Sequence, residues 1–309
     1  MFCMQAATLP LTTTPNRVTL WSALISVYLL WGSTYLFIHF MTERMPPLYM
    51  ASVRYILAGT LLYGYARLTG TPPATRVQWR SAGIVGILLL TIANGCLTVA
   101  LQYIPTGVAA LLGGLLPVFL LTLNWVSFGR KRPTNMALAG LVIGLIGIYF
   151  LIKPDKLQGT GGIHANLIGA GLVTFGNFSW AIGTLLAPRV SLPSATISSG
   201  IQMLVGGVLL LLISLCIEPV TPWSLLDAPA KAVGSMIYLV IFGSIIGFSS
   251  YAWLARNASP QLLSTYAFVN PVVAMMLGTT FAGETFSSQS LLGALVALVG
   301  VVLITLGRK

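Results

Sequence analysis

The sequence predicts an all-α polytopic membrane protein, with ten transmembrane helices arranged as two inverted five-helix repeats. Three observations predict this fold class: a scarcity of charge, a series of long apolar stretches, and an internal repeat. Charged residues make up 7% of the 309 residues, apolar residues make up 56%, and the mean hydropathy is +0.91. Soluble globular proteins carry roughly 25% charged residues. So few charges cannot cover a water-exposed surface, which excludes a soluble enzyme, a disordered chain and a secreted disulfide scaffold.

Ten apolar stretches have the length that a bilayer requires, about 20 residues per helix. Turn-forming sequences such as Met45-Pro46-Pro47 separate them. Because the loop at Pro105 between the third and fourth stretches is very short, a count of nine is the alternative. The predicted spans are 20–40, 47–66, 82–103, 106–127, 136–152, 166–187, 196–217, 233–254, 261–281 and 287–307.

The first span is expected to stay in the protein, because its apolar run is too long for the core of a cleaved signal peptide. The segment 1–19 before it is then a cytoplasmic N-terminal segment.

The distribution of charge gives the orientation. With a cytoplasmic N-terminus, all five acidic residues fall on the external side, together with Arg44, Lys153, Lys156 and Lys231. Since cytoplasmic loops carry the excess of Lys and Arg, this split supports ten spans with both termini in the cytoplasm of a plasma (inner) membrane. The eleven basic residues on the cytoplasmic side are Arg17, Arg67, Arg76, Arg80, Arg130, Lys131, Arg132, Arg189, Arg256, Arg308 and Lys309.

An internal repeat relates the two halves of the chain. Residues 138–147 are similar to residues 291–300 at a shift of 153 positions, and Trp31 in the first half parallels Trp180 in the second. The repeat divides the chain into a first five-helix half, 20–152, and a second, 166–307.

Five is an odd number, so the second half enters the membrane from the opposite side. Inverted repeats of this kind are typical of alternating-access transporters, which bind their substrate near the midplane between the halves. A duplication that serves stability alone is the other interpretation.

Arg54 is the one charged residue deep within a predicted span, about 10 Å from the external end of its helix at 1.5 Å per residue. An ionisable group inside a membrane is costly, and it usually faces protein or water. It is expected either to hold or gate an anionic group of a substrate, or to extend outward and bond the carbonyls of a helix end.

Other polar and aromatic side chains recur along single faces of the spans, as Asn94 and Thr98 do. Together they predict a cavity with aromatic walls and a few amides and hydroxyls, which suits a neutral, zwitterionic or amphipathic organic solute. Packing between helices is the alternative for each residue alone. The predicted substrate-binding residues are Trp31, Tyr35, Arg54, Asn94, Thr98, Asn177, Trp180, Tyr251, Tyr266 and Asn270.

Several classes of function lack the residues they need. No Asp or Glu lies in mid-span, so a carboxylate proton relay has no candidate residue, and two separated histidines offer no catalytic or metal site. The net charge is +11, but the basic residues lie in short segments between the apolar stretches. They do not form the single basic patch that binds nucleic acid. We therefore expect no enzyme activity, no cofactor, no metal and no nucleic-acid partner.

Several short motifs are shared with a known family of membrane proteins. They are Trp31-Gly32-Ser33-Thr34-Tyr35, Ala51-Ser52-Val53-Arg54, Ala93-Asn94-Gly95, Phe242-Gly243-Ser244-Ile245, Tyr266-Ala267-Phe268-Val269-Asn270-Pro271 and Gly283-Glu284. With these motifs the chain resembles the EamA family of the drug/metabolite transporter superfamily, and within it the YedA-type inner-membrane exporters. The resemblance extends over the chain from about residue 20. It implies ten spans, two inverted repeats, a cavity between them, and export of small metabolites, amino acids or drugs.

The expected function is thus export of small organic solutes by alternating access through a cavity at the midplane. A passive, channel-like pore for similar solutes and a non-transporting membrane scaffold are the alternatives. The expected partners are the solute and the lipid bilayer, with the chain as a monomer or homodimer.

Overall fold

Every regular element in the described part of the protein is helical, which confirms the all-α class. The computed structural model describes residues 16–42, 45–104, 109, 112–128, 132–152, 162–220, 230–281 and 288–307. Most of the N-terminal segment lies outside these ranges, as do Glu43, Asp155, Asp227, Glu284 and eight of the basic residues counted above or their side chains.

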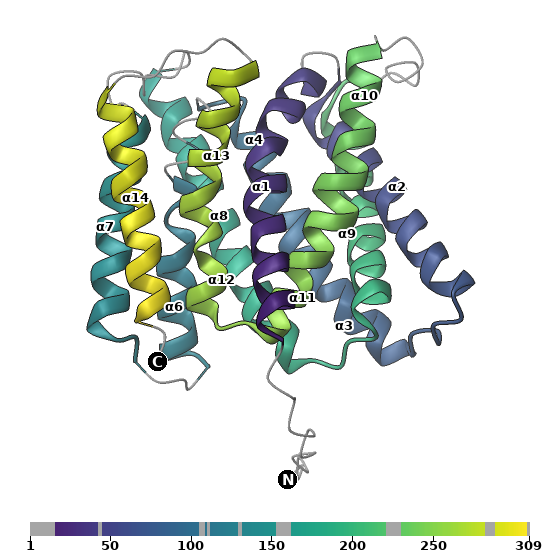
Figure 1. Ribbon diagram of the computed structural model, residues 1–309. Coiled ribbons are helices and arrows are strands. Elements are labelled where there is room, and N and C mark those ends of the chain that lie inside the picture. The colour runs from purple at the N-terminus through teal and green to yellow at the C-terminus, as the bar shows by residue number, and fades with distance from the viewer. Residues whose placement is uncertain are drawn as a thin grey trace.

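The helices overlie the apolar stretches and form one bundle (Figure 1). Their bounds are α1 Arg17–Thr42, α2 Pro47–Leu68, α3 Arg76–Gly86, η1 Ile87–Asn94, α4 Gly95–Ala100, α6 Leu116–Val126, α7 Asn135–Ile152, α8 Gly162–Leu186, η3 Ala187–Arg189, α9 Ala195–Ile217, α10 Ala230–Tyr238, η5 Leu239–Phe248, α11 Ser249–Asn257, α12 Pro260–Ser264, α13 Tyr266–Phe281 and α14 Ser288–Leu306.

Within the described ranges, four continuous helices are long and apolar enough to cross a bilayer on length and composition: Arg76–Ala100, Leu167–Arg189, Ala195–Ile217 and Ala232–Asn257. Shorter apolar helices accompany them, and the count of ten spans stays a prediction.

The third predicted span begins six residues earlier than expected. The Thr75 hydroxyl accepts a hydrogen bond from the Gln78 amide (3.3 Å), and the Gln78 side chain accepts one from the Thr75 amide (2.9 Å). This reciprocal capping box starts α3 within a polar segment, where apolar content gives no signal.

Two helices contain π-helical segments that the sequence did not reveal. Residues Ile87–Asn94 form η1 between α3 and α4, and residues Leu239–Phe248 form η5 between α10 and α11. The π-helix is rare and is frequently found at functional sites.

Two pairs of helices pack at close range because glycines line their contacts. Gly140 of α7 lies against Gly300 and Ile304 of α14, whereas Gly147 lies against Gly293, so the two helices run antiparallel. A Cβ on Gly140 would come within 2.8 Å of the Gly300 carbonyl oxygen. Small residues at such positions let two backbones approach each other.

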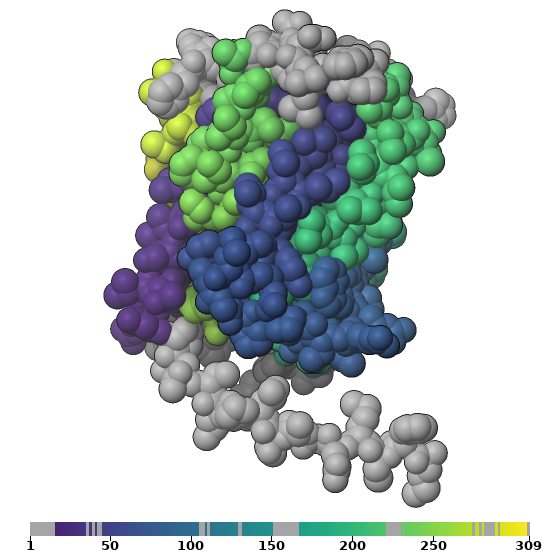
Figure 2. All heavy atoms as spheres, turned by 90° about the vertical axis from the view of Figure 1, so that its right-hand side faces the viewer, coloured from purple at the N-terminus to yellow at the C-terminus, as the bar shows by residue number. Residues whose placement is uncertain are grey.

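The second pair consists of α2 and α9. Gly59 lies against Gly200 and Leu204, and Gly207 lies against Ile56, so this pair is antiparallel as well. Figure 1 places α7 and α14 at one edge of the bundle and α2 and α9 toward the other, with α1 between them. Figure 2 shows α2 crossing the face between α10 and α9.

Candidate functional site

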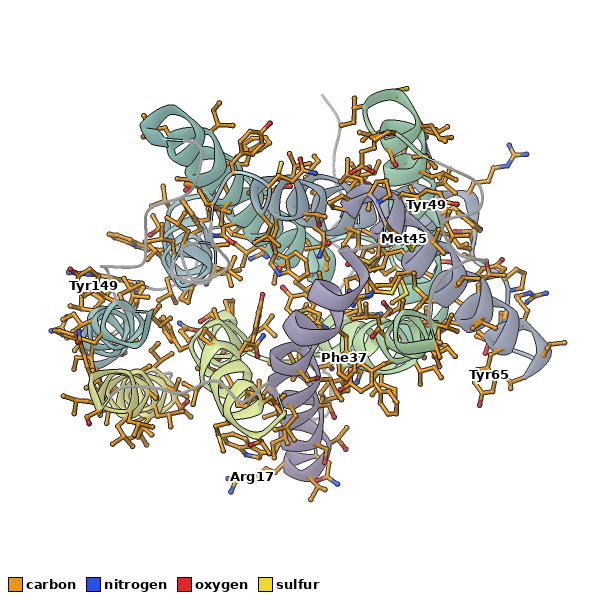
Figure 3. All side chains as sticks on the ribbon, turned by 90° about the horizontal axis from the view of Figure 1, so that it is seen from above. Arg17, Phe37, Met45, Tyr49, Tyr65 and Tyr149 are labelled. Atoms are coloured by element: carbon orange, nitrogen blue, oxygen red, sulfur yellow. The ribbon has the colours of Figure 1, made fainter. Side chains whose placement is uncertain are left out.

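A cavity of about 170 Å³ lies between the α7–α14 pair and the α2–α9 pair. Helices from both halves of the chain line it. The first half contributes side chains from α1, α2, η1, α4 and α6, and the second half contributes side chains from α8, η5 and α13. Figure 3, which views the bundle from above, shows how these helices surround its interior. The predicted site residues that line the cavity are Trp31, Arg54, Asn94, Asn177, Trp180, Tyr266 and Asn270.

Two predicted site residues with described side chains, Thr98 and Tyr251, do not line this cavity. The Thr98 hydroxyl donates to the backbone carbonyl of Asn94 (2.7 Å), one turn earlier, so its proton is used within its own helix. The Tyr251 ring is completely buried behind the tryptophans. The side chain of Tyr35 lies outside the described residues.

Arg54 is buried at 6% exposure, so it does not extend out to solvent. Its Nε donates to the Ser244 hydroxyl of η5 (2.7 Å), and its guanidinium carbon lies 5.2 Å from the centre of the Tyr55 ring. An arginine at the centre of a membrane helix costs about 2.5–3.5 kcal/mol on insertion scales. This position therefore holds a positive charge inside the bundle, at a contact between the two halves of the chain.

A cluster of four aromatic rings adjoins the cavity. Trp31 stacks on Tyr251 at 5.0 Å between ring centroids and meets Trp180 and Tyr266 edge-on at 5.6 and 5.3 Å. Polar atoms of the cluster are paired: the Trp31 indole donates to the Gly243 carbonyl (3.0 Å), and the Trp180 indole donates to the Tyr251 hydroxyl (2.5 Å). The rings thus form a fixed apolar wall whose polar atoms are already satisfied.

Two asparagines hold the backbones of neighbouring helices. The Asn177 amide nitrogen donates to the Leu112 carbonyl (2.7 Å). In the amide orientation that satisfies both of its polar atoms, Asn270 donates to the carbonyls of Tyr28 and Tyr266, each at 3.2 Å. Asn177 therefore keeps its second N–H donor and its carbonyl oxygen for other partners, whereas both polar atoms of Asn270 are already paired.

Sequence reasoning missed several residues of the site. Thr34, Tyr55, Gly243 and Phe248 line the cavity, and Ser244 holds Arg54. A signal for Thr34 existed, because it lies three residues after Trp31 on the same helix face. Gly243 and Ser244 lie in the π-helical segment η5, and its geometry turns them toward the cavity and Arg54. The sequence pattern does not indicate a π-helix at this position.

An interior cavity among apolar helices, lined by amides, aromatic rings and one buried charge, is the arrangement of a protein that binds small solutes within the membrane. The family comparison agrees with this class. A model described as the EamA-like transporter family matches residues 19–153 and 167–306. The chain belongs to the EamA-like transporter family, and it is a multi-pass membrane protein.

Named relatives support this assignment. The chain is 40% identical over 293 residues to the "Uncharacterized inner membrane transporter YedA" of Escherichia coli (strain K12), covering 94% of this chain and 91% of the relative. It is 31% identical to the "WAT1-related protein At3g02690, chloroplastic" of Arabidopsis thaliana, covering 92% of this chain and 69% of that one.

A solved structure shares the fold at low sequence identity. Described as "Crystal structure of protein", it superposes with a TM-score of 0.78 at 17% identity, covering 95% of this chain and all of the other.

Proposed function

We propose that the protein exports small organic solutes by alternating access, through the cavity between two inverted five-helix halves. The observation that carries this proposal is the cavity itself, because residues from both halves of the chain enclose it in the interior of the bundle. A site shared between two halves can be exposed to either side of the membrane when the halves rock against each other.

The helix pairs support an inverted relation between the halves. In the sequence repeat α7 corresponds to α14, and each packs antiparallel on the other. A two-fold axis in the membrane plane brings equivalent helices together in this way. The two π-helical segments support the same relation, because η1 and η5 occupy the corresponding helix in each half.

The charges support cytoplasmic termini. In Figure 1 the first turn of α1 and the last turn of α14 lie at the same end of the bundle as the loops 69–75, 190–194 and 258–259. The helix ends beside these loops carry Arg67, Arg76, Arg80, Arg189 and Arg256, and the positive-inside rule places such an end in the cytoplasm.

The site residues have distinct proposed roles. Trp31 and Trp180 flank the apolar body of the solute, Asn94 and Asn270 orient its polar groups, and Arg54 faces an anionic group. The direction of transport comes from the family resemblance rather than from the geometry.

Counterflow in liposomes tests the mechanism. Protein reconstituted with one unlabelled solute inside should accelerate uptake of the labelled solute, because a carrier returns faster when it is loaded. A channel-like pore gives equal flux with and without internal solute. A scaffold gives none across a panel of amino acids and amphipathic compounds.

Single cysteines test the topology in a background in which Cys3, Cys96 and Cys216 are replaced by serine. Thr71→Cys and Ser191→Cys should react with an impermeant maleimide from the cytoplasmic face, and Val220→Cys from the external face. Labelling of Thr71→Cys and Ser191→Cys from opposite faces contradicts the inverted arrangement.

Untargeted metabolite profiling tests direction. Medium from cells that overexpress the protein should be enriched in compounds that are depleted from medium of deletion cells. Enrichment inside the overexpressing cells contradicts export.

A further inference from the structure

Two arginines near the loop of the α2–α3 hairpin, residues 47–86, have no partner within the described ranges. Arg76 and Arg80 lie one turn apart at the start of α3, and both are exposed. Neither forms a hydrogen bond or an ion pair with the residues that the structure describes. Arg67, in the last turn of α2, uses one donor, from Nη1 to the Thr71 carbonyl (2.6 Å). This end of the hairpin therefore presents positive charge with most of its N–H donors unused.

No carboxylate in the described part of the chain neutralises these arginines. Glu218 is the one acidic residue that this part includes, and its oxygens bind the amides of Leu48 and Tyr49. Those amides lie at the opposite end of α2 from Arg67, roughly 28 Å away along the helix at 1.5 Å per residue. The positive charge at the loop end is thus open to an anion from outside the protein.

Other arginines at the same end of the bundle are held by the protein itself. Arg189 donates to the Leu185 carbonyl, and its guanidinium carbon lies 4.2 Å from the centre of the Phe128 ring. Arg256 donates to the Pro193 carbonyl (3.2 Å). The two arginines of α3 differ from these because their guanidinium groups remain free to bind a ligand.

An exposed apolar strip continues from these arginines along α3. Val77, Arg80 and Ile84 are spaced by three and four residues, which places them on one face of the helix. Val77 is 62% exposed and Ile84 is 51% exposed, whereas Gly83 and Gly86, on the other side of the helix, pack on α9. In a multi-pass membrane protein this strip contacts acyl chains, and a long basic side chain within it extends toward the headgroups.

The loop end of the hairpin lies at the depth of the lipid headgroups. The 22 residues of α2 span about 33 Å at 1.5 Å per residue, which matches the roughly 30 Å of a hydrocarbon core. Leu68 is 91% exposed at this end, and Figure 3 places Tyr65 at the outer edge of the bundle. Trp79 of α3 packs on Tyr63 of α2, with 5.8 Å between the ring centroids. Such aromatic residues are typical of the boundary between lipid and water. In Figures 1 and 2 the hairpin forms one corner of the bundle, where a lipid can reach it.

We propose that the α2–α3 hairpin binds one anionic phospholipid of the adjacent leaflet, which the proposed topology makes the cytoplasmic one. The phosphate lies between the guanidinium groups of Arg76 and Arg80, and Arg67 adds positive charge at the same end of the hairpin. One acyl chain follows Val77 and Ile84 toward the interior of the membrane. Basic sites at the cytoplasmic ends of membrane helices bind acidic headgroups in this way. The inference is independent of the transported solute and of the transport mechanism.

Native mass spectrometry of the purified, delipidated full-length protein tests this site with three probes. They are dioleoyl phosphatidylglycerol, dioleoyl phosphatidylcholine, which has the same acyl chains, and glycerophosphoglycerol, which has the anionic headgroup without the chains. We expect one phosphatidylglycerol to bind about thirtyfold more tightly than phosphatidylcholine, because each arginine near the membrane surface contributes about fivefold. The headgroup alone should not bind measurably at the same concentration, since it lacks the contact with the apolar strip.

Variants assign the contact with the headgroup. Arg76→Gln combined with Arg80→Gln should lower the affinity for phosphatidylglycerol about thirtyfold and leave the affinity for phosphatidylcholine unchanged. Arg76→Lys combined with Arg80→Lys keeps the charge and should retain most of the affinity, because lysine also binds phosphate. Arg17→Gln is the matched control, since Arg17 is exposed at the same end of the bundle but lies on α1, away from the hairpin in Figure 3. It should bind phosphatidylglycerol as the wild type does.

The unfolding midpoint without lipid should be the same in all of these proteins, because the substituted side chains are exposed. The inference is overturned if phosphatidylcholine binds as tightly as phosphatidylglycerol, or if the glutamine pair keeps the affinity of the wild type. It is also overturned if the lysine pair or Arg17→Gln loses as much affinity as the glutamine pair. Equal binding of glycerophosphoglycerol would overturn the lipid as the occupant and indicate a soluble anion instead.

Discussion

The indole rings of Trp31 and Trp180 meet edge to face, with centroids 5.6 Å apart and planes inclined by 77°. These two residues occupy corresponding positions in the sequence repeat, one in each half of the chain. Under the proposed inverted arrangement, corresponding residues that touch must lie close to the axis that relates the halves. This contact joins the two halves at the wall of the cavity.

The hydrogen bond within this cluster can be tested apart from its rings. Trp180→Phe keeps an aromatic ring but removes the indole donor to the Tyr251 hydroxyl, which Thr184 also contacts. We expect the free energy of unfolding to fall by about 0.5–1.5 kcal/mol, the net contribution of one hydrogen bond, plus a smaller loss of ring contact. Chemical denaturation of the purified protein measures this change. Trp125→Phe is a suitable control because Trp125 is 46% exposed and lies outside the cavity lining.

The two amides proposed to orient the solute can be removed together. Asn94→Ala combined with Asn270→Ala should reduce counterflow by about fivefold or more, because each lost hydrogen bond costs about 0.5–1.5 kcal/mol of binding. The variant Asn257→Ala is the control, since Asn257 is exposed at the end of α11 and bonds its own helix. Unchanged counterflow in the double variant would remove both amides from the site.

Two glycines of α2 form a matched pair for the helix contact. Gly59→Ala places a methyl group 2.8 Å from the Leu204 amide nitrogen, whereas a Cβ on Gly64 meets nothing within 4 Å. We expect Gly59→Ala to destabilise the protein by about 1–3 kcal/mol through overpacking against α9. Gly64→Ala should be neutral, or stabilising by up to about 1 kcal/mol, because alanine favours the helix. Thermal unfolding in detergent compares them, and equal midpoints would contradict the close contact.

Glu218 ties the end of α9 to the start of α2. Its two carboxylate oxygens accept the amides of Leu48 and Tyr49 (both 2.9 Å), and the Ser214 hydroxyl donates to it as well (2.7 Å). Because this carboxylate satisfies the free N–H groups at a helix N-terminus and complements the helix dipole, Glu218→Ala should cost about 1–2 kcal/mol. Glu218→Gln should cost less, since one oxygen can still accept.

Proteolysis measures this effect locally. Cleavage near residues 45–50 should become faster in Glu218→Ala than in the wild type, and intermediate in Glu218→Gln. If cleavage rates are the same in all three proteins, the cap does not hold this helix end.

Several features of the site were readable from sequence because each follows from a single side chain. Arg54 was singled out because a charge in an apolar stretch needs a special environment, and the structure buries it at the cavity. Another predicted site residue lies outside the cavity lining for a local reason. Thr98 carried the same polar signal as Asn94, but its hydroxyl bonds the carbonyl one turn back, a choice that helix periodicity does not reveal.

The sequence by itself determined that the chain is helical and lies in a membrane, and which stretches are apolar. These properties are sums over individual residues, because each side chain has its own free energy of transfer between water and lipid. The tertiary structure decided which polar groups share one cavity, that Ser244 and Gly243 seat Arg54, and that Tyr251 supports the tryptophans from behind. Those relations depend on contacts between helices far apart in the sequence, and on the π-helical turns of η5, which no single-residue preference encodes.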